Sequence, residues 1–216
     1  MRPRSRALVA ALALTVGALA CTTATAPTRA RAYGFRLNNG AAFHWPRSRL
    51  PVRYWVDPAA GDSVRAYVAT GLMAWEDQFL YGEFRAVLVA DSDSADVRVS
   101  VTNGAPPMAP RDPALPPDPS ACEGVTSDSL TSDGLGLAAP FQIHLSWKSY
   151  PPSDVANCLA RVAAHEIGHS LGLFEHSPSP ADLMFAQPTV DQPQVGDRQT
   201  VQLLYGTPSD LAPPPR

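Results

Sequence analysis

The stretch His165–Phe185, which reads HEIGHSLGLFEHSPSPADLMF, decides how the chain folds around its candidate functional site. Apolar residues lead into it, so its first half is predicted to be a buried helix. His165 and His169 are four residues apart, which places both imidazoles on one face of that helix, where they could hold a zinc ion at roughly 2.0–2.1 Å. Glu166 follows the first histidine and is the candidate general base for a metal-bound water.

The HExxH pattern is only moderately specific by itself, because a helical His–Glu pair can also belong to a solvated face. Gly172 strengthens the metal-site interpretation, since a glycine three residues after His169 can end the helix in a left-handed turn and bring the chain back beneath the metal. A third ligand is then expected within a few residues. Glu175 and His176 are the two candidates.

The same stretch resembles the metzincin signature, HExxHxxGxxH followed by a Met-turn, and specifically its matrixin branch. Strict spacing would place the third ligand at Glu175, whereas His176 comes one residue later. Counted from His176, the downstream positions match the branch: Ser177, Pro180, Leu183, Met184 and Phe185. We therefore expect His176 to be the ligand and keep Glu175 as the alternative. The resemblance implies that Met184 forms a hydrophobic floor beneath the histidines, a role that overlaps with that of an ordinary core methionine.

Hydrophobic periodicity outside this stretch predicts an α+β domain. Strands are expected at 52–56, 84–89, 95–101 and 141–147, and helices at 63–80, from 153 into the HExxH motif, and at 199–204. Residues 104–121 hold seven prolines and are expected to be a loop. The strand at 141–147 could be an edge strand that pairs with an extended substrate, or an inner strand. The resemblance implies a zincin/metzincin-like domain, with a mixed twisted sheet, two long helices and a short C-terminal helix.

The N-terminus has the pattern of an export signal. A basic start is followed by an uncharged apolar run, residues 7–20, which is too short to span a bilayer comfortably. Cys21 follows directly and resembles the acylated cysteine of bacterial lipoproteins, although Ala18 stands where that family prefers Leu. We expect an exported protein, extracellular or periplasmic, that is either lipid-anchored at Cys21 or freely secreted. We expect a signal peptide at 1–20, a tether or short pro-segment at 21–44, a catalytic domain at 45–207 and a Pro-rich tail at 208–216.

Cys122 and Cys158 remain as a pair if Cys21 carries lipid. In an oxidising compartment they are candidates for a disulfide, which would stabilise the fold by roughly 3–4 kcal/mol on the chain-entropy model. The alternative is two unpaired buried thiols.

The net charge of −3 provides no basic footprint for nucleic acid. We expect a monomer that contacts a membrane only through the lipid anchor. The matrixin resemblance implies a zinc endopeptidase with one catalytic Zn²⁺ and a protein or peptide substrate, and nothing in the sequence indicates a structural Ca²⁺. Two alternatives stay open: a catalytically inactive zinc-binding surface module, and a zinc amidase that acts on cell-wall material.

Overall fold

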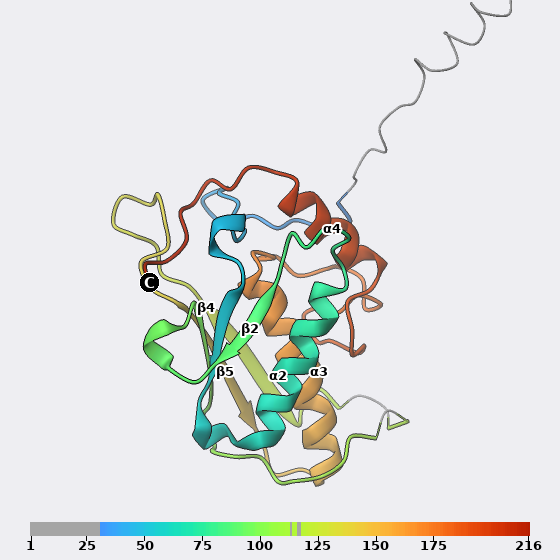
Figure 1. Cartoon of the computed structure of the whole chain (residues 1–216). Coiled ribbons are helices and arrows are strands. Elements are labelled where there is room, and N and C mark those ends of the chain that lie inside the picture. The colour runs from blue at the N-terminus through green and yellow to red at the C-terminus, as the bar shows by residue number, and fades with distance from the viewer. Residues whose placement is uncertain (1–30, 113, 116–117) are drawn as a thin grey trace, which may run out of the picture.

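The computed structural model describes residues 31–112, 114–115 and 118–216. Its centre is a five-stranded sheet (Figure 1). The strand order is β2-β1-β3-β5-β4. The strands are β1 Val52–Val56, β2 Ala86–Val89, β3 Val97–Val101, β4 Cys122–Ser127 and β5 Phe141–Trp147. All neighbours pair in parallel except β4, which runs antiparallel to β5 at one edge. The expected α+β class with a mixed sheet is confirmed.

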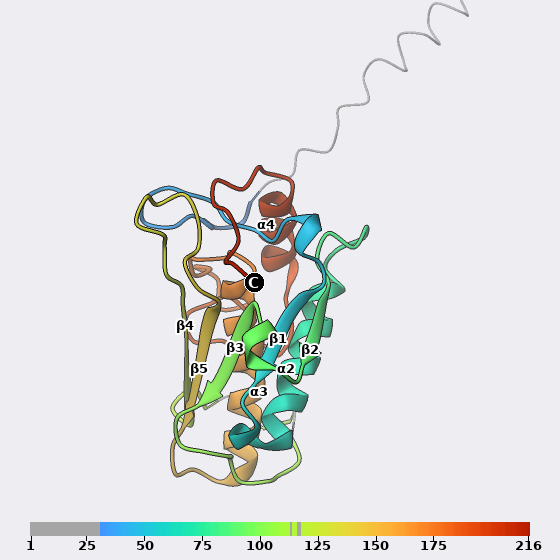
Figure 2. The same ribbon diagram turned by 60° about the vertical axis from the view of Figure 1, so that its left-hand side comes forward.

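Two long helices cover one face of this sheet, as Figure 2 shows. The helices are α2 Gly61–Glu76, α3 Pro152–Ser170 and the shorter α4 Val195–Tyr205, with 3-10 turns at Arg47–Arg49, Pro58–Ala60 and Ser92–Ser94. The indole Nε1 of Trp75 on α2 donates to the carbonyl oxygen of Ala164 on α3 at 2.8 Å. Gly71 permits this close approach, because a Cβ there would lie 3.1 Å from the Cα of Ala164. The contact fixes α3, which carries the histidine motif.

The edge strand β4 differs from the sequence expectation, which placed no strand at 122–127. Gly124 and the side chain of Thr126 face α3, whereas Val125 is exposed, so the strand lacks the usual apolar alternation. Of the two interpretations of strand 141–147, the inner one holds, because β5 lies between β3 and β4. The expected helix 63–80 ends at Glu76, and Phe79 turns inward to pack 4.8 Å from the ring of Tyr205.

The segment that precedes the expected catalytic domain packs into it. Tyr33, Phe35 and Phe43 are all less than a tenth exposed. Residues 32–44 are therefore not a free tether, because their aromatic side chains contribute to the hydrophobic core. Removal of this region as a pro-segment stays a prediction. The expected signal peptide and Cys21 lie outside the described residues.

The chain end also returns to the sheet. Leu211 is buried, and the backbone of Ala212 bonds to Leu135 and Leu137. The guanidinium of Arg216 reaches the buried carboxylate of Asp96 at 2.8 Å. Within the described part of the chain, we find no helix with the length and hydropathy needed to cross a bilayer.

Candidate metal centre

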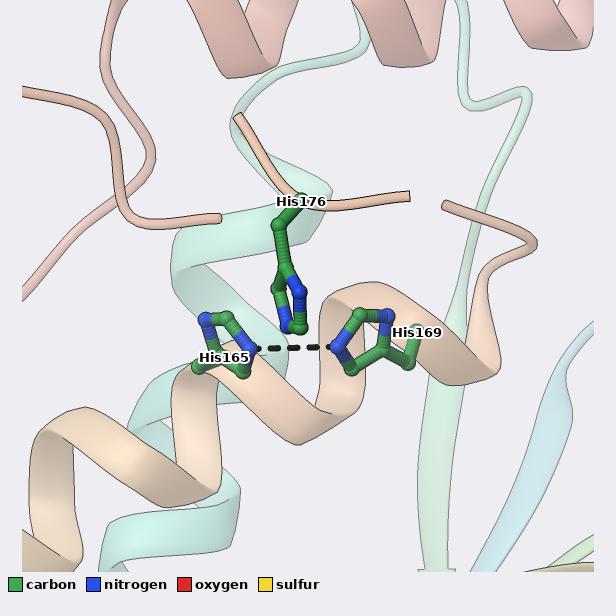
Figure 3. Close-up of side chains that lie close together, drawn as sticks. All are labelled: His165, His169 and His176. Atoms are coloured by element: carbon green, nitrogen blue, oxygen red, sulfur yellow. Dashed lines mark hydrogen bonds between the residues drawn. The ribbon is translucent and has the colours of Figure 1, made fainter. Parts of the chain in front are cut away.

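Three histidine side chains converge at the C-terminal half of α3 (Figure 3). His165 and His169 come from α3 itself, and His176 comes from the loop that follows it. One ring nitrogen of each lies within 4.8 Å of the others, and the ring of His176 is centred 5.2 Å from that of His165 and 5.0 Å from that of His169. This is a set of three nitrogen ligands that faces one point, as a tetrahedral metal ion with one open position requires.

Hydrogen bonds fix which nitrogen of two of these rings is free. Nδ1 of His165 donates to the carbonyl oxygen of Leu183 at 2.8 Å, and Nδ1 of His169 donates to that of Leu173 at 2.6 Å. A carbonyl oxygen can only accept, so each Nδ1 carries the hydrogen and each Nε2 of the neutral ring presents a lone pair. The two Nε2 atoms lie 3.1 Å apart, joined by the dashed line in Figure 3. Two facing lone pairs repel each other, and a cation between them removes that conflict.

The protonation state of the two helix histidines fits the same conclusion. Burial lowers the pKa of His165 to about 4, and the bond to Leu183 opposes this only in part. Burial, and then the nearby charge of His165, lowers the pKa of His169 to about 3. Both rings are therefore neutral at physiological pH, which is the form that binds metal. The donor set and its charge fit Zn²⁺.

The turn after α3 brings His176, rather than Glu175, to this point. Gly172 has a φ of 105°, and a Cβ there would overlap the carbonyl oxygen of Phe43, so only glycine fits. The carboxylate of Glu175 is hydrogen-bonded to the backbone N–H of Arg36 at 3.2 Å and is not among the atoms that face the histidines. The side chain of Glu175 therefore points toward residues 32–44, which we call the N-terminal segment.

Glu166 lies on α3 at the same cleft and is 4% exposed. Its Oε2 accepts a hydrogen bond from the hydroxyl of Thr126 on β4 at 2.7 Å, and the same hydroxyl reaches its backbone oxygen at 3.0 Å. Burial raises the pKa of Glu166 to about 7, while the bonds from Thr126 work in the opposite direction. Thr126 was not found from the sequence, because β4 itself was not expected.

The turn that carries Met184 packs against α3 at Gly168, between His165 and His169 in the sequence. Met184 is fully buried, and its sulfur packs against Gly168 of α3. Asp197 on α4 holds this turn by accepting from the backbone N–H of Leu183 at 2.7 Å and of Met184 at 3.1 Å. Leu183 in turn orients His165, so Asp197 supports the ligand through the backbone. Asp197 was not predicted from the sequence, where the available signal was an acidic residue in the first turn of the closing helix.

Cys122 and Cys158 form a disulfide in the structure, and it joins β4 to α3. Both cysteines line a cavity of about 460 Å³ on one side of the histidines. A second cavity, of about 360 Å³, lies on the other side and is lined in part by the N-terminal segment. Gly124, Glu166 and His176 line both cavities. The three-histidine centre therefore lies between two hollows of one cleft.

The sequence also matches a known protein family. Residues 52–206 match the family model of the matrixin peptidases. The chain is 35% identical over 88 residues to matrix metalloproteinase-16 of Homo sapiens and of Rattus norvegicus, and this match covers 38% of the chain but only 14% of the length of those relatives. Among solved structures it is similar to high choriolytic enzyme 1, a hatching enzyme zinc-protease from Oryzias latipes, with a TM-score of 0.40 and 12% identity over 76% of this chain and 94% of that one. Because the family model spans well over half of the sequence, histidine motif included, the chain belongs to the matrixin family of zinc-dependent metallopeptidases.

Proposed function

We propose that the chain is a zinc-dependent endopeptidase whose metal is held by His165, His169 and His176 and whose general base is Glu166. The position of Glu166 carries this proposal, because its buried carboxylate lines both hollows of the cleft together with His176. A protein that only stored or displayed zinc would not need a carboxylate at this point, since burying one is costly.

The residues of the centre divide the chemistry between them. Bound zinc would lower the pKa of its water to about 7 and polarise the substrate carbonyl. Glu166 takes the proton of the attacking water and returns it to the leaving amine, a role its buried carboxylate can fill because it lines the same cavities as His176. Thr126 holds that carboxylate in place through the 2.7 Å hydrogen bond before substrate arrives. Water is the nucleophile, so no serine or cysteine is needed.

The shape of the cleft supports cleavage of internal peptide bonds. The two cavities give room for substrate residues on both sides of Glu166. Among the described residues, β4 is an edge strand that has no strand partner on its outer side, and Gly124 and Thr126 of this strand line the cleft. An extended peptide could add to this edge through main-chain hydrogen bonds. We therefore propose β4, rather than the strand at 141–147, as the edge strand that pairs with an extended substrate.

Incubation of the zinc-loaded protein with casein and with a peptide library tests the proposal. We expect cleavage that a chelator abolishes and added zinc restores. Cleavage of cell-wall fragments alone would favour the amidase alternative, and bound zinc without any hydrolysis would favour the inactive surface module. Each of these outcomes would contradict the endopeptidase proposal.

The third ligand has its own test. We expect His176→Ala to lower the zinc content measured by mass spectrometry and to abolish cleavage, because it removes one of three nitrogen donors. Glu175→Ala should retain one zinc per chain, since its carboxylate bonds to the N-terminal segment. The reverse pattern would show that Glu175 is the ligand.

We also propose that the protein is exported to the extracellular space or the periplasm, as a monomer that is either secreted or lipid-anchored at Cys21. The disulfide between Cys122 and Cys158 supports an oxidising compartment. Mass spectrometry of the mature N-terminal peptide would separate the two forms, since an acylated Cys21 carries the mass of its lipid. A retained residue 1–20 segment would contradict export by signal cleavage.

A further inference from the structure

The smaller cavity beside the histidines has a wall that the family motif does not provide. The N-terminal segment forms this wall through Arg36, Leu37 and Asn38, and the side toward β4 is lined by Val125, Thr126 and the following Asp128. Glu166, His169 and His176 line the same cavity, so anything bound in it lies next to the reacting centre. The N-terminal segment is therefore placed to contact substrate.

Glu175 links this wall to the loop that carries His176. Its Oε1 accepts from the backbone N–H of Arg36 at 3.2 Å. A Cβ on Gly34 would overlap the Glu175 carboxylate, so glycine at 34 is what allows the segment to pass so closely. The extra residue before His176 thus has a structural partner, and that partner is the segment that lines the cavity.

The segment is also held on both sides of this contact. The hydroxyl of Tyr33 donates to Asp197 at 2.8 Å, and the backbone N–H of Ala32 donates to Thr200 at 3.1 Å. Phe43 is fully buried. Fixed at both ends, residues 34–38 form a wall that exists before substrate binds, which lowers the entropy cost of binding.

The charges at this cavity favour a cation. Asp128 lines it just beyond β4, and within the described part of the chain no Arg or Lys lies within ion-pair distance of its carboxylate. Partial burial raises the pKa of Asp128, as expected for a carboxylate that lacks a cation. The one cation of the wall, Arg36, is already bound by Asp210 at 3.3 Å and by the carbonyl oxygen of Gly40 at 2.6 Å.

We propose that this cavity is a substrate subsite for a basic side chain, that Asp128 selects this side chain, and that Glu175 is the positioning residue for the opposite wall. The inference rests on the proposed endopeptidase function and deepens it by naming the class of substrate residue. It also makes residues 33–43 part of the working enzyme rather than a removable segment.

Peptides of matched sequence test the charge selection. A peptide that the protein cleaves at one bond is varied with Lys, norleucine or Glu at each position around that bond. At one position we expect kcat/KM for Lys to exceed that for norleucine by about fivefold, as a half-exposed charge pair allows, and the ratio to shrink as salt is raised. Asp128→Asn should bring the ratio close to one, whereas the control Asp93→Asn, at an exposed carboxylate that lines neither cavity, should not change it.

Variants of Glu175 test the wall. We expect Glu175→Ala to raise KM severalfold with kcat and zinc content preserved, and Glu175→Gln, which keeps an acceptor oxygen, to restore most of the loss. A wild-type enzyme without a Lys preference, a preference that survives in Asp128→Asn, or an unchanged KM in Glu175→Ala would overturn the subsite. Absence of any peptide cleavage would instead overturn the proposed function itself.

Discussion

Gly124 offers a sharp test of how Glu166 is positioned. It lies in β4 opposite α3, and a Cβ added there would be 2.7 Å from Oε1 of Glu166 and 2.8 Å from its Cγ. The same Cβ would overlap Cγ1 of Val162. Its backbone does not need a positive φ, so Gly124→Ala is compatible with the strand itself. The substitution therefore acts on the Glu166 carboxylate, the proposed general base, without touching any of the three histidines.

The size of the effect follows from these contacts. Ordinary contacts between carbon and its neighbours are about 3.5 Å or longer, so the carboxylate must move by roughly 0.8 Å. That displacement weakens the 2.7 Å bond from Thr126, which fixes the carboxylate. A misplacement of about 1 Å at a reacting group can cost on the order of 100-fold in rate. We expect Gly124→Ala to lower kcat by about 10- to 100-fold, with one zinc still bound per chain.

The assay combines kcat on a cleaved peptide, zinc content and the circular dichroism spectrum. Ser127→Ala is the matched control, because Ser127 lies in the same strand and lines neither cavity. The double variant Gly124→Ala/Val162→Ala removes the collision with Val162 but keeps the one with Glu166, so we expect it to remain slow. A wild-type kcat in Gly124→Ala, with zinc bound, would show that Glu166 need not be held at its present position.

Two further predictions concern stability. Replacing Cys122 and Cys158 by Ser opens a link between residues that are 36 apart, and we expect the free energy of unfolding in urea to fall by roughly 3–4 kcal/mol; an unchanged value would show that the bond does not constrain the unfolded chain. Burial would raise the pKa of Asp96, but the bonds from Arg216 and two further donors outweigh it, so its pKa is lowered. Asp96 therefore stabilises the fold above its unfolded pKa of about 3.9, and this contribution is lost as pH falls through the lower folded value. Asp96→Asn should be less stable at neutral pH and should lose less stability between about pH 4 and 2; an equal acid dependence would contradict this assignment.

The elements of the fold that depend on regular hydrophobic periodicity could be predicted from the sequence. The alternation of Val52, Tyr54 and Val56 predicted β1, and the apolar approach to His165 predicted that α3 is buried. Such patterns arise because a whole face of each element meets the core. These elements predicted the α+β class with its mixed sheet, and the histidine motif predicted the family of the chain.

The features that the sequence did not predict depend on contacts between residues that are distant in the chain. β4 shows no apolar alternation, because glycine and threonine face the helix where other strands place large apolar side chains. The N-terminal segment is anchored by single aromatic residues such as Tyr33 and Phe43, which have no period to detect. Asp197 and Thr126 support the centre from α4 and β4, far away in the sequence. Their roles become visible only once the chain is folded.

In the proposed mechanism, Glu166 performs the proton transfer at a zinc centre built from three histidines. Its most direct test is a comparison of zinc content and peptide cleavage between the wild type and Glu166→Gln, which keeps the size of the side chain and removes its basicity. We expect one zinc per chain in both proteins, cleavage by the wild type, and a loss of several orders of magnitude in kcat for the variant. Comparable cleavage by zinc-loaded Glu166→Gln would contradict the account.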